Sequence, residues 1–426
     1  MKKKDYSKIA LDYSKKFHGK IELKPTVKVK SLDDLSIFYT PGVAAVSTAI
    51  SNNNDLSWDL TWRWNTIFIV TNGTRVLGLG NVGPLASLPV MEGKSLIYKD
   101  FGGVNAVPIP IPTRDIDEFV NVVKNISATA GGIHLEDIEA PFCFDVLERL
   151  QKELKVPVWH DDQQGTAAAT LAGLINSAKL TEKNLRKARI VLVGAGAANV
   201  ALFRVLESYG VNMKNVIVSD SKGPLFAGRD DVDELRVKNR WKYDIILKSN
   251  GDGVSAIENA FDGADIVVGF SSPGAIKPDW IKRMGSKPIV FANANPIPDI
   301  SPEDAYKAGA YIVSTGRSDY PNQVNNSLIF PGLFRGVLDS RASKVDDLTA
   351  IVAAEELARF AQAKGIKRNY IIPNMMERDI YPRIASAVAE DAVKRGFAAI
   401  KGTKAFFYAK AKKLTSPGKK RRSYLF

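Results

Sequence analysis

The sequence is poor in cysteine and has no long apolar segment. Its 426 residues include one cysteine, Cys143, which excludes a disulfide framework within the chain and is typical of a reducing compartment. No uninterrupted run of about 18 apolar residues, the length that spans a membrane, is present. The basic start MKKKDYSKIALDYSKKFHGK lacks the apolar core of a secretion signal. We therefore expect a soluble, cytoplasmic protein with no membrane partner.

The formal net charge of +13 is concentrated at the two ends of the chain. Residues 1–30 hold ten lysines against three acids, and residues 401–426 hold nine basic residues and no acid. The body between them is slightly acidic, so its composition does not indicate a nucleic-acid-binding domain. The tail KKRRSYLF can contact nucleic acid or an anionic surface, but we favour a solvated or intersubunit-docked terminus.

The length exceeds what one hydrophobic core usually serves, so we expect two domains. We assign residues 1–160 to an N-terminal α/β domain, 161–400 to a second domain ending in helices, and 401–426 to a basic tail. Continuous apolar strands alternate with helical stretches in the second domain: RIVLVGAG, NVIVSD, ADIVVGF, PIVFANANP and YIVSTG. Such strands predict a parallel sheet covered on both faces. The expected fold class is α/β, with a doubly wound, Rossmann-like second domain.

The segment VLVGAGAANV indicates a dinucleotide site at the start of that domain. Gly194, Gly196 and Asn199 occupy the three positions of the GxGxxG/A pattern, between a strand and a helix. We expect Gly194, Gly196, Ala197 and Ala198 to contact a pyrophosphate at the helix N-terminus. Asn199 departs from the pattern, and a glycine-rich turn that binds nothing is the alternative.

The next strand ends at Asp220, 26 residues after Gly194. A carboxylate there accepts hydrogen bonds from the adenosine ribose, which slightly favours NAD. Lys222, two residues on, can meet a 2′-phosphate, so NADP stays open. A helix or turn cap is the alternative role of Asp220.

Two acidic pairs stand after probable strands: Glu136 and Asp137 in GGIHLEDIEAP, and Asp161 and Asp162 in VWHDDQQGT. Buried carboxylates are unfavourable unless they are compensated, and a hard divalent cation compensates several at once. We therefore predict that Glu136, Asp137 and Asp162 bind Mg²⁺ or Mn²⁺. Taken one by one, these acids can equally cap helices or pair with arginines.

The motifs together, over roughly residues 15–400, resemble malic enzymes of the short prokaryotic type. They include DDLSIFYTPGVA, VLGLGNVGPLASLPVMEGK, GGIHLEDIEAPFCFDVLERL, VPVWHDDQQGT, FANANPIPDI and STGRSDYPNQVNNSLIFPGLFRGVLD. The resemblance implies NAD(P)⁺-dependent oxidative decarboxylation of L-malate to pyruvate and CO₂, with the N-terminal domain as the catalytic one. A homodimer or higher homo-oligomer is the default assembly.

By motif, Tyr39 resembles the acid that protonates the enolate, and Lys94 resembles the base that takes the C2 hydroxyl proton. Glu136, Asp137 and Asp162 match the metal ligands, and Asn295 and Asn325 match residues of the cofactor and malate sites, respectively. A lysine acts as a base near neutral pH only if its pKa is lowered, which a neighbouring cation and burial would do. Without the motifs, Tyr39 would be an ordinary aromatic and Lys94 a solvated lysine.

The chain departs from the family pattern at several positions. Gln164 replaces the second histidine of HDDQHGT, and His134 replaces the asparagine of GGINLEDI. Asn72 and Asn81 replace two family aspartates, and none of these changes removes a proposed ligand or catalytic residue.

Two alternative functions remain open. A malolactic-type enzyme would keep its NAD bound and release lactate. A catalytically silent NAD(P)-binding regulatory protein is the other, and retention of Tyr39, Lys94 and the three ligands argues against it.

Overall fold

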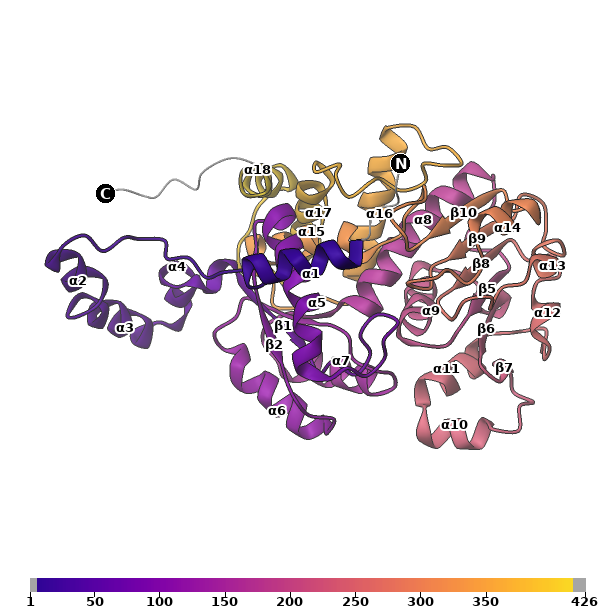
Figure 1. Cartoon of the computed structure of the whole chain (residues 1–426), viewed down its shortest axis with the longest axis horizontal. Coiled ribbons are helices and arrows are strands. Elements are labelled where there is room, and N and C mark those ends of the chain that lie inside the picture. The colour runs from indigo at the N-terminus through magenta and orange to yellow at the C-terminus, as the bar shows by residue number, and fades with distance from the viewer. Residues whose placement is uncertain (1–5, 417–426) are drawn as a thin grey trace.

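Two largely parallel sheets, built from successive parts of the chain, form the centre of the molecule (Figure 1). The computed structural model describes residues 6–416. The basic residues KKRRSYLF, 419–426, lie outside the described residues, so their expected role stays a prediction.

The first sheet has the strand order β2-β1-β3-β4, and every pairing in it is parallel. Its strands are β1 (Thr66–Thr71), β2 (Asn105–Pro110), β3 (Ile133–Leu135) and β4 (Val158–His160). The connecting helices are α5 (Gly83–Ile97), α6 (Ile116–Ser127) and α7 (Phe142–Glu153). Because the strands are parallel, the carboxyl ends of β3 and β4 lie side by side at one edge.

The second sheet has the order β10-β9-β8-β5-β6-β7 and is parallel except for the short last strand. Its strands are β5 (Ile190–Val193), β6 (Val216–Asp220), β7 (Gly223–Pro224), β8 (Ile266–Gly269), β9 (Ile289–Ala292) and β10 (Ile312–Thr315). Its helices are α8 (Thr166–Leu180), α9 (Ala197–Tyr209), α10 (Val232–Lys238), α11 (Arg240–Lys248), α12 (Ile257–Ala260), α13 (Pro278–Ile281) and α14 (Pro302–Lys307). The order reverses at β5, as in doubly wound folds, so the expected fold class is confirmed.

The last helices return to the first sheet. They are α15 (Phe330–Ser340), α16 (Asp347–Ala363), α17 (Ile380–Lys394) and α18 (Lys404–Thr415). A Cβ on Gly131, just before β3, would lie 2.4 Å from Leu338 Cδ2 of α15, so this close approach requires glycine. Helix α18 lies in the region expected to be a basic tail, and it buries Phe407 and Ala411, one turn apart.

One hydrophobic core extends through both sheets. It includes Ile67 of β1, Val158 of β4, Leu192 of β5, Phe291 of β9 and Leu357 of α16. The two expected domains therefore share buried contacts and are joined by the C-terminal helices as well as by the chain between β4 and α8.

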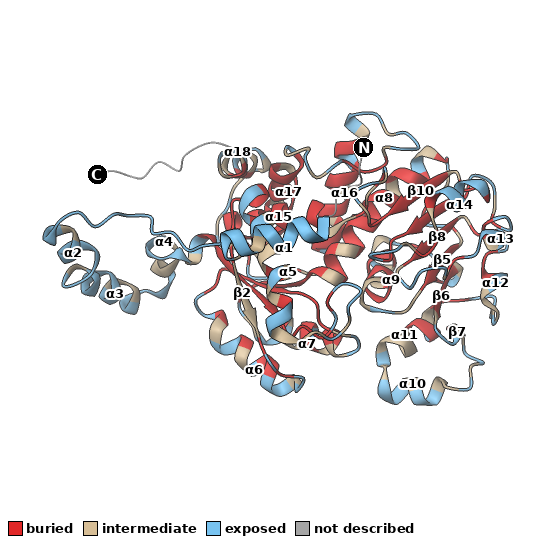
Figure 2. Ribbon diagram, viewed as in Figure 1, coloured by how far each residue is buried: buried red, intermediate tan, exposed pale blue. Residues whose placement is uncertain are grey.

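The four N-terminal helices contain no buried residue, a feature that they share with α10. They are α1 (Tyr6–Phe17), α2 (Leu32–Phe38), α3 (Gly42–Asn52) and α4 (Ser57–Leu60). Helices α2 and α3 stand away from the two sheets and are coloured as exposed along most of their length (Figure 2). We call residues 31–53 the arm. Among the described residues, no helix combines the length and apolar character needed to cross a bilayer.

A buried ion pair connects α15 to its surroundings. Arg335 Nη2 lies 3.0 Å from Asp339 Oδ1, and both side chains are buried. Arg335 Nη1 also donates to Asn65 Oδ1 at 2.5 Å, and Lys410 Nζ of α18 lies 3.3 Å from Asp339 Oδ1.

Replacing Arg335 by methionine should lower the free energy of unfolding by about 3–5 kcal/mol, because it leaves the Asp339 carboxylate buried with one partner fewer. Urea denaturation measures this change. Arg236→Met is the matched control, since Arg236 and its partner Asp233 are 62% and 93% exposed, and its loss should stay below about 1 kcal/mol. Equal losses in the two variants would contradict the importance of the buried pair.

Candidate active site

Three carboxylates meet at the adjacent ends of β3 and β4. Glu136 and Asp137 directly follow β3, and Asp162 lies in the π-helical turn Asp161–Gly165 that directly follows β4. One oxygen of each lies within 4.8 Å of one from each of the others. The Asp137 N–H donates to Asp162 Oδ2 at 2.8 Å, which fixes the two segments relative to each other. The structure thus brings together all three predicted metal ligands.

This cluster fits a hard divalent cation. Asp137 Oδ2 is buried and has no hydrogen-bond partner among the described residues. Asp137 also has a left-handed backbone, with φ of 54°, an uncommon conformation for a residue with a side chain. Converging carboxylate oxygens, one of them without a partner, match the donor set that Mg²⁺ and Mn²⁺ prefer.

Lys94, near the end of α5, lies against the same carboxylates. Its Nζ is 2.6 Å from Asp161 Oδ2 and 3.0 Å from Glu136 Oε1. It also donates to Asn326 Oδ1 at 3.3 Å and lies 4.7 Å from the centre of the Phe330 ring. The ammonium is therefore held by residues from both halves of the chain.

The charges in this cluster shift one another's pKa values. Burial disfavours the charged form of Glu136, but the Lys94 ammonium and the His134 ring outweigh it and hold the pKa of Glu136 at about 2. Burial and the Glu136 charge raise the pKa of Asp137 to about 8, and they raise that of Asp162 well above its ordinary value. Burial opposes the charged form of Lys94, yet Asp161 and Glu136 keep its pKa above the ordinary value. Without a metal, Lys94 is thus the counter-ion of the acids.

Asp161 has a role that the sequence analysis did not assign. Besides Lys94, its carboxylate accepts a hydrogen bond from Trp159 Nε1 at 3.0 Å, and the side chain is fully buried. The two acids of the HDD segment thus have different partners: Asp162 belongs to the carboxylate cluster with Glu136 and Asp137, and Asp161 binds Lys94. The adjacency of the two acids was the available signal, but the sequence did not separate their roles.

His134 also belongs to the site. Its Nε2 lies 2.7 Å from Glu136 Oε2, and its Nδ1 lies 2.7 Å from the Tyr98 hydroxyl. All three side chains are buried, so the ring fixes the orientation of Glu136. This buried chain of contacts gives the departure at His134 a physical role.

Two of the other departures, Gln164 and Asn72, have hydrogen-bond partners. Gln164 Nε2 donates to Asp347 Oδ1 of α16 at 2.9 Å, and Asn72 bonds to Thr74 and to the carbonyl of Thr113. Gln164 thus connects the turn that carries Asp162 to the C-terminal helices. For Asn81 the structure gives no comparable role.

Tyr39, the predicted proton donor, does not lie at the cluster formed by Lys94 and the carboxylates of its own chain. It caps the C-terminus of α2, and its side chain is 69% exposed. The arm that carries it stands apart from α5, the helix of Lys94 (Figure 1). The cluster of one chain therefore lacks the predicted proton donor.

The glycine-rich turn has an open space for a ligand. Gly194 has φ of 98°, and a Cβ there would lie 2.9 Å from the carbonyl oxygen of Phe270, so only glycine fits. Gly196 is the N-cap residue of α9, and a Cβ there would have no atom within 4 Å. Ala197 and Ala198 follow as the first two residues of the helix. The first N–H groups of α9 thus border free space, which suits a pyrophosphate.

Asn199 stands at the third position of the GxGxxG/A pattern, where glycine or alanine is usual, and the strand–helix turn stays closed despite the larger side chain. Its Nδ2 donates to the carbonyls of Val193 and Gly194 at 3.0 and 2.8 Å, and the side chain is buried. The amide thereby closes the strand–helix turn with hydrogen bonds, where a small residue would do so by close packing.

The remaining predicted residues lie at the same edge or nearby. Asp220 ends β6, and exposed Asn295 follows β9 and contacts Gly316, where a Cβ would lie 2.7 Å from its Nδ2. The Asn325 side chain accepts from the Ser327 N–H at 2.9 Å. It is Asn326, the next residue, that contacts Lys94, a distinction that the motif QVNNS did not reveal.

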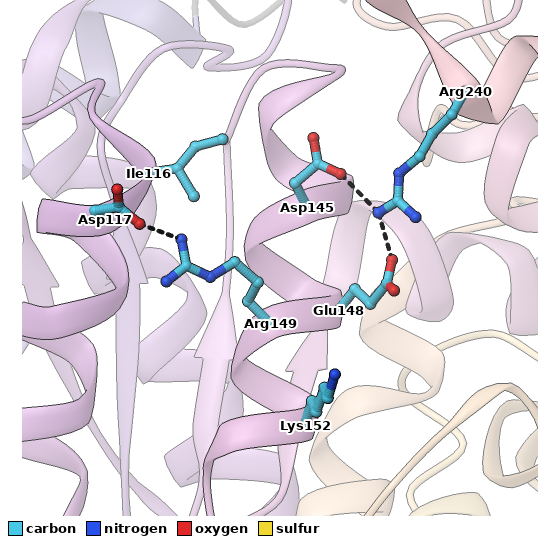
Figure 3. A pocket seen from close by; sticks show the side chains of 7 residues that line it. All are labelled: Ile116, Asp117, Asp145, Glu148, Arg149, Lys152 and Arg240. Carbon is cyan, nitrogen blue, oxygen red and sulfur yellow. Dashed lines mark hydrogen bonds and ion pairs between the residues drawn. The ribbon is translucent and has the colours of Figure 1, made fainter. Parts of the chain in front are cut away.

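A shallow groove between α6, α7 and α11 is a separate feature (Figure 3). Arg149 Nη1 lies 2.5 Å from Asp117 Oδ1, and Arg240 lies 2.8 Å from Asp145 and 2.5 Å from Glu148. Because these acids are already paired with arginines, the groove is not our candidate site. The ion pairs of Arg240 with Asp145 and Glu148 join α11 to α7.

Comparison with known families matches most of the chain. The family "Malic enzyme, NAD binding domain" matches residues 163–393. The family "Malic enzyme, N-terminal domain" matches residues 18–115 and 110–151.

Characterised relatives carry related names. The chain is 43% identical over 410 residues to the "Bifunctional malic/malolactic enzyme" of Bacillus subtilis, covering 96% of this chain and 98% of that protein. It is 44% identical to an "NAD-dependent malic enzyme" of Geobacillus stearothermophilus, covering 89% and 78%. An "NADP-dependent malic enzyme" of Rhizobium meliloti is 42% identical over 91% of this chain, which spans only 52% of that longer protein.

Solved structures agree with the sequence comparison. The malic enzyme of Entamoeba histolytica superposes with a TM-score of 0.92 at 42% identity, covering 96% of this chain and 86% of that one. The malic enzyme of Pyrococcus horikoshii gives 0.90 at 42% identity, covering 95% and 96%.

We expect Mn²⁺ binding to strengthen as the pH rises from 6 to 8. Because the pKa of Asp137 is about 8, its carboxyl is protonated at lower pH, and a bound cation must displace that proton. The affinity should rise about tenfold per pH unit for each proton displaced. Isothermal titration calorimetry of the metal-free protein measures it.

Asp162→Asn should weaken Mn²⁺ binding at every pH, whereas Asp117→Asn in the groove should not. An affinity that is independent of pH in this range, or equal in the two variants, would contradict the site.

Proposed function

The chain belongs to the malic enzyme family, and from this membership we propose that it oxidatively decarboxylates L-malate to pyruvate and CO₂ while reducing NAD(P)⁺. The observation that carries this proposal is the convergence of Glu136, Asp137 and Asp162 beside Lys94. We propose that the domain of residues 1–160 carries the malate chemistry, completed by Asp161, Asp162 and Asn326 of the second domain. Residues 161–400 would bind the cofactor, and we expect the protein to act in the cytoplasm.

Each residue of the cluster has a task in this reaction. Glu136, Asp137 and Asp162 would hold Mg²⁺ or Mn²⁺, which when bound polarises the C2 oxygen of malate and stabilises the enolate. With these carboxylates ligated, Lys94 faces fewer free negative charges, so its pKa falls and its amine can take the C2 hydroxyl proton. Asp161 and Asn326 keep Nζ in position for this transfer.

The cofactor would lie along the edge of the second sheet. Gly194 and Gly196 border the space for the pyrophosphate, next to the backbone of Ala197 and Ala198. Asn295, which follows β9 and lies beside Gly78 of the first half of the chain, is a further residue that we assign to the cofactor. Asn325 is placed next to Asn326, where its free amide group can reach malate.

We further propose that the working form is a homodimer in which the arm of one copy brings Tyr39 to the other. The arm exposes Leu32, Ile37 and Phe38 as well as Tyr39, and such a large apolar surface is rarely left in water. On α5, the helix of Lys94, Leu85 and Leu96 are also exposed. An arm docked on this helix would cover both surfaces and bring a proton donor for the enolate to the cluster.

A second function deserves the same test. The Bacillus subtilis relative is named as both a malic and a malolactic enzyme, and the two reactions share the first steps at the same residues. In the malolactic case the reduced cofactor stays bound and lactate leaves. A catalytically silent role is disfavoured, because Lys94 and the three ligands are intact and converge.

The first experiment mixes the full-length protein with L-malate and NAD⁺ or NADP⁺, with and without Mn²⁺. Absorbance reports the reduced cofactor, and pyruvate and lactate are assayed in parallel. We expect metal-dependent reduced cofactor and equimolar pyruvate. Lactate without free reduced cofactor would establish the malolactic reaction. If neither pyruvate nor lactate forms, both proposed functions are refuted.

Mixed dimers test the position of Tyr39. Tyr39→Phe and Lys94→Met chains should each be nearly inactive alone. Co-expressed in equal amounts, they should regain about a quarter of the wild-type activity, because half of the dimers are hybrids with one intact site. If Tyr39 acts within its own chain, no site is intact and no activity returns. If the Tyr39→Phe variant expressed alone is as active as the wild type, Tyr39 has no part in the mechanism.

A further inference from the structure

His134 and Glu136 lie two residues apart where β3 ends, so their side chains share one face of the strand. The Glu136 N–H donates to the Val70 carbonyl at 3.1 Å, which continues the strand pairing up to the acid. The two oxygens of the Glu136 carboxylate have different partners. Lys94 Nζ lies 3.0 Å from Oε1, and His134 Nε2 lies 2.7 Å from Oε2. One oxygen of this predicted metal ligand is therefore engaged by a ring of its own strand.

The direction of the hydrogen bond between His134 and Glu136 follows from its partners. Burial opposes the charge of Glu136, but the Lys94 ammonium and the His134 ring hold its pKa at about 2. The carboxylate therefore carries no proton near neutral pH, and an ionised carboxylate only accepts. Nε2 must carry the proton that is donated, while Nδ1 lies 2.7 Å from the Tyr98 hydroxyl.

The His134 ring has little freedom to turn away from Glu136. It is fully buried, and its centre lies 5.5 Å from that of Tyr98, 5.8 Å from that of Phe330 and 6.2 Å from that of Phe334. Tyr98 directly follows α5, and the two phenylalanines belong to α15. A carboxylate held by so confined a donor cannot readily rotate to present both of its oxygens to a ligand.

Divalent cations differ in what they require from a carboxylate. Mg²⁺ takes about six oxygens at near-ideal octahedral positions, roughly 2.0–2.1 Å away, whereas Ca²⁺ takes about six to eight at roughly 2.3–2.6 Å. Ca²⁺ reaches the higher number by using both oxygens of a carboxylate. An acid that offers one oxygen therefore suits the octahedral ions better than Ca²⁺.

We propose that His134 makes the metal site selective for Mg²⁺ and Mn²⁺ over Ca²⁺, by holding Oε2 of Glu136 and leaving one oxygen to the cation. His134 is then a positioning residue, because it acts through Glu136 and does not touch the ion. Hydrogen-bond partners of metal ligands typically change metal affinity about 10–100-fold. The inference rests on the proposed function only in that the carboxylate cluster binds a divalent cation.

The competing view is that the hydrogen bond merely satisfies a buried ring. Two substitutions of His134 separate the views, because an asparagine amide reaches about as far as Nδ1 and a glutamine amide about as far as Nε2. Asparagine, the residue of the family motif at this position, can still meet Tyr98 but loses the contact with Glu136. Glutamine keeps an N–H donor for Glu136 and is the matched control, since both replacements are uncharged amides.

The test measures metal binding to the full-length, metal-free protein and needs no turnover of malate. The electron paramagnetic resonance signal of free Mn²⁺ reports its binding, and Mg²⁺ and Ca²⁺ are then compared by how well each displaces it. We expect the wild type to bind Mg²⁺ more tightly than Ca²⁺. His134→Asn should lower this preference about tenfold, and His134→Gln should retain most of it. Urea denaturation of both variants checks that they fold.

Three results would overturn the inference. A wild type that binds Ca²⁺ as tightly as Mg²⁺ has no selectivity for His134 to set, and this result needs no variant to fold. A preference that is unchanged in His134→Asn, or lost equally in His134→Gln, would leave the ring with a structural role alone and the malic enzyme reaction intact. If the wild type binds none of the three ions, the metal site itself is refuted, and the proposed function with it.

Discussion

The site depends on the compensation of buried negative charge around Lys94. Four carboxylates, those of Glu136, Asp137, Asp161 and Asp162, meet where β3 and β4 end, in surroundings that disfavour unpaired charge. The ammonium satisfies part of this demand, and a divalent cation would satisfy the rest. The same balance that stabilises the resting protein therefore also sets the protonation state of the base.

The core explains why these groups stay in place. Phe330, the first residue of α15, and Asn326, in the 3-10 turn just before it, contact Lys94. Helix α15 is packed on the first sheet at Gly131. The buried pair of Arg335 and Asp339 anchors the same helix. The C-terminal helices thus pack with the first sheet, although they follow the second sheet in the chain.

The strands and the acidic site could be predicted from the sequence. The partners of Lys94 and the exposure of the arm could not, because both depend on contacts between distant parts of the chain. Continuous apolar runs indicated the strands of the second sheet. The acidic pairs after probable strands led to the prediction that Glu136, Asp137 and Asp162 form one site, and the structure does bring their carboxylates together. The partners of Lys94 were harder to predict, because one of them, Asn326, is 232 residues away in sequence. Nor does any local pattern reveal that α2 and α3 are left without a buried residue, because burial depends on what the rest of the chain covers.

The amide of Asn199 has a consequence for the thermodynamics of cofactor capture. A glycine-rich turn normally has many accessible conformations, and a ligand that selects one of them loses affinity in doing so. Here the two hydrogen bonds from Asn199 to the carbonyls of Val193 and Gly194 restrict the turn before any ligand arrives. The dinucleotide therefore meets a preorganised cradle, and little of its binding free energy is spent on ordering the loop.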